Sequence, residues 1–266
     1  MRHDKASLRV EDLDEENLDD VFRICSHGKL DDPLQQQGIE LKRQWLLEML
    51  KECRPCTKIA YLGDRPVAQL LFYAEAAAPF IPDPRKDVVV IHCVYSPFSE
   101  ARGIGAGRKL LKSLMEDCKT GLSCFGGRPY RFIVANPFNT GEGVPLDKFY
   151  AANGFKQGEG EMFLEVTASY QPRGLREYRP LPEDRGRALI FYDPMCEYGY
   201  PFAVRVREFL GEMDPNLPVE LIDKWRSPEE SIKRGSQWLV VNAKPITSFW
   251  AQKEAFKREV EQALGR

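Results

Sequence analysis

The sequence lacks several features that would assign it to a class of protein at once. It contains no run of eighteen apolar residues, so a helix that spans a membrane is not expected. The residues Met1 to Lys5 lead into polar and acidic sequence without an apolar segment, so we expect no signal peptide. The charge is balanced, with 38 basic against 40 acidic side chains. Binding to nucleic acid or to a membrane surface is therefore not expected, and we predict a cytoplasmic protein.

Residues that commonly bind metals or form disulfides are also sparse or poorly arranged. His3, His27 and His92 are too scattered in the sequence to predict a metal site. The seven cysteines are an odd number and do not form a framework of secreted disulfides. Cys53 and Cys56 could form a redox pair or half of a zinc site, but no second pair accompanies them. We therefore interpret this segment as a plain loop and expect no metal.

The length of 266 residues allows one large domain or two modest ones, each with its own core. Residues 169–187 are rich in proline and arginine, which is typical of a linker. The sequence therefore predicts a first domain over residues 1–168 and a second over residues 188–266.

The most informative stretch is Arg102-Gly103-Ile104-Gly105-Ala106-Gly107-Arg108, which follows an apolar run from Val88 to Val94. A strand, a glycine-rich turn and a helix leave several backbone N–H groups pointing the same way, which favours binding of an anion. A P-loop would need Gly-Lys-Ser/Thr, which is missing here. A dinucleotide-binding fingerprint that begins at Gly103 would need glycine at position 108, where Arg108 stands.

Two motifs resemble the GNAT family of N-acetyltransferases. The spacing Arg-x-x-Gly-x-Gly over residues 102–107 resembles that family's pyrophosphate-binding loop. The segment Lys148-Phe149-Tyr150-Ala151-Ala152-Asn153-Gly154-Phe155 resembles its later Phe-Tyr-x-x-x-Gly-Phe motif. The expected order of strand, long helix (103–119), strand (130–135), short helix (146–152) and strand (162–166) is similar as well. The long connection from 94 to 102 and the insertion at 137–143 depart from the family pattern.

The resemblance implies an α/β (α+β) acyl-CoA acyltransferase fold with a mixed, mostly antiparallel sheet. It also implies that acetyl-CoA is the co-substrate and a primary amine is the acceptor, which would attack directly in a ternary complex. The residues that it places against the coenzyme are Val94, Arg102, Gly103, Ile104, Gly105, Ala106, Gly107, Arg108 and Phe149. By the same resemblance the N–H near Val94 binds the oxyanion, and Tyr150 protonates the departing thiolate. Glu75 and His92 are the candidates for the general base, and a relay through water is the alternative.

In the carboxyl-terminal region we expect a strand (188–192), a helix (200–210), a strand (219–222), a short helix (228–233), a strand (238–241), a turn and a last helix (249–264). This β-α-β-α-β-β-α order resembles a small thioredoxin-like domain, with Cys196 just after its first strand. The segments 191–196 and 91–94 resemble the YoaP-type acetyltransferases, which join the two modules. Gly199 stands where a redox thioredoxin carries its second cysteine, so dithiol exchange is not available to this domain alone. We interpret Cys196 as a structural or a single reactive thiol.

Two other functions stay open from the sequence. The chain could bind coenzyme A as a sensor or interaction protein with weak or no transfer activity. It could also be a thiol redox protein that uses Cys196 together with Cys53 or Cys56. The sequence does not identify the acceptor, and it leaves a homodimer open.

Overall fold

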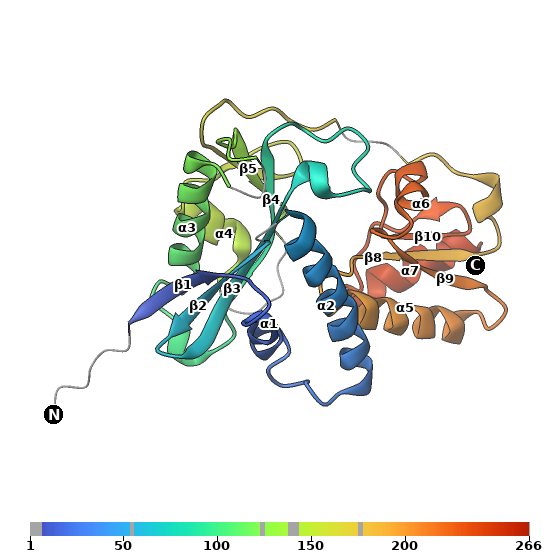
Figure 1. Cartoon of the computed structure of the whole chain (residues 1–266). Helices are drawn as coiled ribbons and strands as arrows, with labels where there is room; N and C mark the ends of the chain where they lie inside the picture. Colours follow the sequence, from blue (N-terminus) through green and yellow to red (C-terminus); the bar gives the residue numbers. More distant parts are fainter. Residues whose placement is uncertain (1–6, 54–55, 123–125, 138–143, 175–177, 266) are drawn as a thin grey trace. The chain divides into compact units, whose positions relative to one another are not determined.

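The computed structural model describes residues 7–53, 56–122, 126–137, 144–174 and 178–265 (Figure 1). The chain divides into two compact units. The first unit comprises residues 1–30, 43–78 and 83–173, and the second comprises residues 31–42, 79–82 and 174–266. The change between the long segments of the two units falls within the predicted linker. Two short segments from the amino-terminal half also belong to the second unit.

The first unit is built on a mixed seven-stranded sheet with the order β1-β2-β3-β4-β5-β7-β6. Only β4 and β5 pair in parallel, and the other neighbours are antiparallel. The prediction of a mixed, mostly antiparallel sheet is therefore confirmed. The elements are β1 (Leu8–Asp12), α1 (Leu18–Cys25), β2 (Thr57–Leu62), β3 (Arg65–Ala74), η1 (Glu75–Ala77), β4 (Val88–Tyr95), η2 (Ser99–Ala101), α3 (Ala106–Thr120), β5 (Phe132–Ala135), α4 (Leu146–Ala152), β6 (Lys156–Gln157) and β7 (Met162–Glu165). Helix α2 (Pro33–Cys53) has residues in both units.

Helices cover both faces of this sheet because successive strand residues point to opposite sides (Figure 1). On β3, Leu70 and Phe72 join a buried apolar cluster with Leu110 of α3. Gln69, next to Leu70, instead donates a hydrogen bond to the sulfur of Cys25 in α1. The sheet thus separates α3 from α1.

Three helices differ in their bounds from the sequence predictions. The apolar spacing of residues 14–25 predicts a helix from Asp14, but α1 begins at Leu18, because the Asp14 carboxylate accepts hydrogen bonds from the amides of Glu16 and Asn17 and closes a turn. Helix α3 begins at Ala106 because the backbone before it turns at two glycines. The same spacing predicts a helix over residues 39–50, and α2 is longer, from Pro33 to Cys53.

The second unit holds a four-stranded sheet with the order β11-β10-β8-β9, in which only β8 and β9 are parallel. Its elements are η4 (Pro182–Asp184), β8 (Ala188–Tyr192), α5 (Gly199–Met213), β9 (Val219–Asp223), α6 (Pro228–Lys233), β10 (Leu239–Val241), β11 (Lys244–Pro245) and α7 (Lys253–Leu264). Helices α5 and α7 pack on one face, where Ile190, Val206 and Phe256 are buried together. The last helix, α7, begins at Lys253, four residues after the predicted start at position 249.

The later part of the predicted linker packs as part of the second unit. Asp184 is fully buried, and its carboxylate accepts hydrogen bonds of 2.7 Å from two nitrogens of Arg234. Tyr178 packs against Leu189 and Phe191, on the face of the sheet opposite to α5. Within the described part of the chain, no helix is long and apolar enough to cross a membrane.

Candidate active site

Strand β4 extends past the end of β5. The parallel pairing of β4 with β5 ends where Ile91 lies opposite Ala135, yet β4 continues to Tyr95. On its other side, β4 stays paired with β3, with Val94 opposite Leu70. A bulge at His92 accompanies this change, because Phe72 pairs with Ile91 while Leu71 pairs with Cys93. Residues 92–95 of β4 therefore lie beyond its pairing with β5.

The glycine-rich loop presents amides and positive charge at the start of α3. Gly103 and Gly105 adopt φ of 74° and 82°, a region that glycine enters without strain, and Gly105 caps the helix. The first amides of a helix have no partner within it, so those of Ala106, Gly107 and Arg108 are available to an anion. Arg102 and Arg108 are exposed, and no carboxylate among the described residues pairs with either of them. The chemistry of this loop suits an anion such as a phosphate group.

A close approach at Gly107 joins the glycine-rich loop, β4 and α4. A β-carbon added at Gly107 would lie 3.3 Å from the ring of Phe149 and 3.6 Å from Cγ1 of Val94. The space beside Gly107 is tight for a side chain, and its φ is not positive. Three segments that the sequence predicts to share a site thus lie close together.

Tyr150 of α4 is buried next to Phe149, which takes part in this contact. The side chain is 1% exposed and packs between the rings of Phe149 and Phe155, at 5.4 and 5.1 Å between centroids. No residue that the structure describes hydrogen-bonds to its hydroxyl oxygen. Burial, and secondarily the charge of Cys93, raise the pKa of Tyr150 above its ordinary value. The phenol is therefore held in its protonated, neutral form.

The two candidate bases are placed differently. His92 lies at the bulge, in the part of β4 beyond its pairing with β5, adjacent in sequence to Cys93. Glu75 follows β3 at the other end of the β3–β4 pair, five residues beyond Leu70, which corresponds to roughly 16 Å of strand. The structure therefore does not bring Glu75 to Val94 or Gly107, and its prediction as a general base is not supported.

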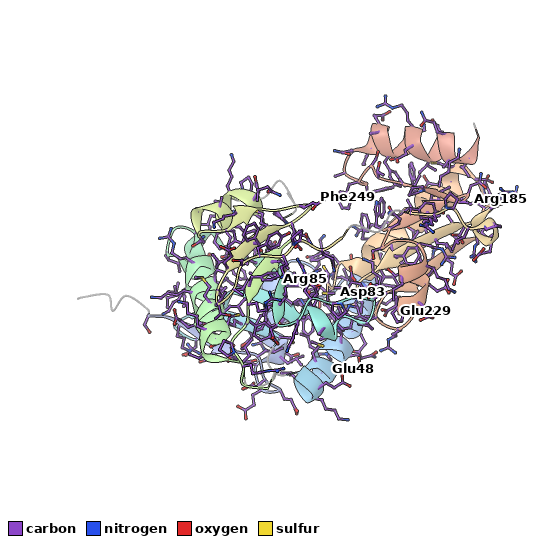
Figure 2. All side chains as sticks on the ribbon, turned by 90° about the horizontal axis from the view of Figure 1, so that it is seen from above. Glu48, Asp83, Arg85, Arg185, Glu229 and Phe249 are labelled. Atoms are coloured by element: carbon purple, nitrogen blue, oxygen red, sulfur yellow. The ribbon has the colours of Figure 1, made fainter. Side chains whose placement is uncertain are left out.

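Glu75 is instead part of a buried ion cluster centred on Arg85, which Figure 2 labels among the side chains of the first unit. Arg85 Nη2 lies 2.6 Å from Glu75 Oε2, and Arg85 Nη1 lies 2.5 Å from Glu161 Oε1. Glu75 is fully buried and Arg85 is nearly so. The tyrosine hydroxyl of Tyr170 also donates to Glu161 at 3.0 Å. A carboxylate held in this way is occupied by its own partner.

Cys93 lies in the segment 91–94 and has no predicted role. It is half-buried on β4, between His92 and Val94, and its charge influences the pKa of Tyr150. Its position in sequence between two predicted site residues was the only available signal. Only the structure shows that the pairing of β4 with β5 ends before this position.

In the second unit, Cys196 lies between β8 and α5. Burial is the main cause that raises the pKa of its thiol, while the charge of Lys42 acts in the opposite direction. A β-carbon added at Gly199 would lie only 2.5 Å from the carbonyl oxygen of Asp193. A second cysteine at position 199 would therefore require the backbone to shift. Among the described residues, Cys25, Cys56, Cys93, Cys118 and Cys196 form no disulfide.

The remaining expectations concern metals and residues outside the description. Among the described residues, no group of three His, Cys, Asp or Glu side chains could hold a metal ion. His3, Arg54, Pro55 and most of the 137–143 insertion lie outside the described residues.

Comparisons with known proteins give low similarity. No protein-family model matches the chain, and no curated protein matches it. Among solved structures, an N-acetyltransferase from Staphylococcus aureus Mu50 aligns over 60% of this chain and 99% of its own, with 14% identity and a TM-score of 0.44. A GNAT family acetyltransferase from Brucella melitensis in complex with acetyl-CoA aligns over 64% of this chain and 94% of its own, with 14% identity and a TM-score of 0.40.

A further solved structure is the PaiA N-acetyltransferase from Thermoplasma acidophilum in complex with coenzyme A. It aligns over 62% of this chain and 99% of its own, with 14% identity and a TM-score of 0.40. Likeness at this level is too low to assign a function. The function must therefore be inferred from the residues of the site.

Proposed function

We propose that the first unit transfers an acetyl group from acetyl-CoA to a primary amine. The observation that carries this proposal is the buried side chain of Tyr150, held in its protonated form, next to Phe149, which contacts the position of Gly107 as Val94 does. A neutral phenol can give its proton to a thiolate that leaves from a thioester.

The residues of the site supply each requirement of acetyl transfer. The amides that begin α3, with Arg102 and Arg108, bind the coenzyme's pyrophosphate. The remaining loop contacts are Gly103, Ile104, Gly105 and Ala106. The pantetheine arm lies along the part of β4 beyond its pairing with β5, and the N–H near Val94 donates to the oxyanion. His92, directly or through water, removes a proton from the amine, and Tyr150 protonates the departing sulfur.

Replacing Tyr150 by Phe tests the proposal. We expect kcat to fall about 10²-fold or more, the usual contribution of a general acid, with the affinity for coenzyme A nearly unchanged. Turnover is measured by release of free thiol over a panel of amine acceptors, and affinity by calorimetry. The matched control is Tyr178→Phe in the second unit. It removes a buried hydroxyl that has no hydrogen-bond partner among the described residues. Equal rates in the two variants would remove Tyr150 from the mechanism.

The pH dependence gives a second reading of the same residue. An acid must be protonated to act, and a raised pKa keeps Tyr150 protonated at higher pH. The wild-type rate should therefore show no loss from Tyr150 ionisation up to at least pH ~10, the ordinary pKa of tyrosine. A Tyr150-dependent decline of kcat near pH 8, missing in Tyr150→Phe, would contradict this assignment.

For the second unit we propose a thioredoxin-like module, as in YoaP-type proteins. Its β-α-β-α-β-β-α order, with parallel β8 and β9 beside antiparallel β10 and β11, supports this proposal. The clash expected at position 199 argues against dithiol exchange by Cys196. Binding of coenzyme A without transfer to any amine would instead favour the sensor hypothesis.

A further inference from the structure

The segment 96–101 links the end of β4 to the glycine-rich loop. It belongs to the long connection that departs from the family pattern. Ser99–Ala101 form the short 3-10 helix η2, and the amide of Arg102 donates to the carbonyl of Ser99 at 3.1 Å. Ala101 is buried in the same apolar cluster as the inner face of α3. The position of Arg102, the first residue of the loop, therefore depends on the position of this segment.

The side chain of Phe98 anchors this segment to two other parts of the first unit. The Phe98 ring lies 5.1 Å from the ring of His27, which follows α1, measured between centroids. The guanidinium of Arg65, at the start of β3, lies 4.5 Å from the centroid of the Phe98 ring. Arg65 also forms an ion pair with Glu100 of the same segment. Contacts between two rings, and between a cation and a ring, are both attractive, so they hold the segment in place.

We propose that Phe98 is a positioning residue that holds the glycine-rich loop in the conformation that binds the pyrophosphate of acetyl-CoA. The inference rests on the proposed function, because that function places the pyrophosphate on this loop. It goes beyond that function because it assigns part of the affinity for the coenzyme to a side chain outside the loop.

The loop needs such an anchor because of its glycines. Gly103 and Gly105 are exposed and both adopt positive φ. Glycine has more backbone freedom than other residues, so a loop that becomes ordered only on binding loses affinity. Helix α3 fixes one end of this loop, and the segment 96–101 fixes the other. The anchor at Phe98 thus lowers the entropic cost of binding the coenzyme.

The experiment compares acetyl-CoA with S-acetylpantetheine, a thioester that lacks the pyrophosphate. The variant Phe98→Leu removes the ring and keeps much of the apolar packing. We expect its KM for acetyl-CoA to rise about fivefold, with kcat within about twofold of the wild type. Its kcat/KM for S-acetylpantetheine should stay within about twofold, because that substrate makes no use of the loop. Phe98→Tyr keeps the ring and should retain the wild-type KM. Thiol release with the best acceptor of the amine panel measures each rate.

Arg65→Ala tests the same contact from β3. The Arg65 side chain is 58% exposed, so its loss should not prevent folding, and the KM for acetyl-CoA should again rise. The matched control is Arg43→Ala. Arg43 lies 4.8 Å from the centroid of the Phe22 ring and pairs with Asp19, which are both outside the segment 96–101. Its loss should leave the KM for acetyl-CoA unchanged.

Equal losses with the two thioesters would show that Phe98 only supports the fold, and this result would overturn the inference. An equal rise of KM in Arg43→Ala, or an unchanged KM in both Phe98→Leu and Arg65→Ala, would overturn it as well. Calorimetry of the wild type with coenzyme A separates the possible failures. If the wild type binds coenzyme A and transfers acetyl groups while the variants behave like it, only this inference fails. If the wild type binds no coenzyme A, the proposed function fails with it.

Discussion

At the scale of single residues, two glycines decide what can lie beside them. Gly107 allows Val94 and Phe149 to approach the start of α3, and Gly199 leaves room for the carbonyl of Asp193. Neither position has a positive φ, so the backbone would accept other residues there if the neighbours left space. These glycines are therefore explained by packing and not by turn geometry.

Replacing Gly107 by Val should damage the site directly. The added atoms would press on Phe149 and Val94, and overpacking of this kind costs about 1–3 kcal/mol. We expect a lower free energy of unfolding and an affinity for coenzyme A at least about tenfold weaker. Urea denaturation and calorimetry measure the two effects. Gly211→Ala in α5 is the control, because a β-carbon there meets nothing within 4 Å and should stabilise the helix by about 0.5–1 kcal/mol. An unchanged affinity in Gly107→Val would argue that coenzyme A binds elsewhere.

At the scale of elements, the Arg85 cluster connects the segment between β3 and β4 to the segment before β7. Arg85 precedes β4, Glu75 follows β3, and Glu161 immediately precedes β7. A buried arginine that bonds two carboxylates satisfies charges that would be costly alone. The cluster therefore has a structural explanation without a role in proton transfer.

Replacing Glu75 by Gln separates these two roles. Removing one member of a buried ion cluster typically costs about 3–5 kcal/mol, so the melting temperature should fall by at least several degrees. The kcat of the folded enzyme should stay within about twofold, because Glu75 lies away from Val94. The control is Glu165→Gln, whose ion pair with Lys156 is exposed and screened by solvent, so its loss should change the melting temperature little. A loss of kcat about 10²-fold at unchanged stability would restore Glu75 as the base.

At the scale of the whole molecule, the second unit includes residues far away in the sequence. Lys42 Nζ lies 2.6 Å from Glu197 Oε2, and both side chains are at most 2% exposed. Gln35 donates to the carbonyl of Glu197, and a β-carbon on Gly38 would lie 1.9 Å from that same carbonyl oxygen. The second unit therefore depends on the segment 31–42 as well as on the carboxyl-terminal part of the chain.

The Lys42–Glu197 pair can be tested as a unit. Lys42→Met should destabilise the second unit by about 3–5 kcal/mol, because it leaves a buried carboxylate without its counter-charge. The double variant Lys42→Met with Glu197→Leu should recover most of that loss, since both buried charges are removed together. Denaturation followed by the fluorescence of Trp238 and Trp250 in the second unit, together with limited proteolysis, reports the result. Additive losses in the double variant would show that the two side chains are not coupled.

Local sequence patterns determined much of the fold and part of the site. Strand β8 and helices α4 and α6 have the predicted bounds, and most other elements differ by a few residues. The glycines before α3 and the Phe149–Tyr150 segment marked two parts of the site, because turn geometry and helical spacing are written in neighbouring residues. The ion pair of Glu75 could not be read from the sequence, because its partner Arg85, ten positions later, is brought to it by the folded chain.

What the sequence alone determined is therefore the order of the elements, the glycine-rich loop and the identity of Tyr150 as a candidate. The tertiary structure decided where the pairing of β4 with β5 ends, that Glu75 pairs with Arg85, and that Tyr150 is buried between two aromatic rings. It also decided that Lys42 pairs with Glu197 across 155 positions. The physical reason is that turns and helix starts depend on adjacent residues, whereas burial, pairing and open edges depend on contacts between distant ones.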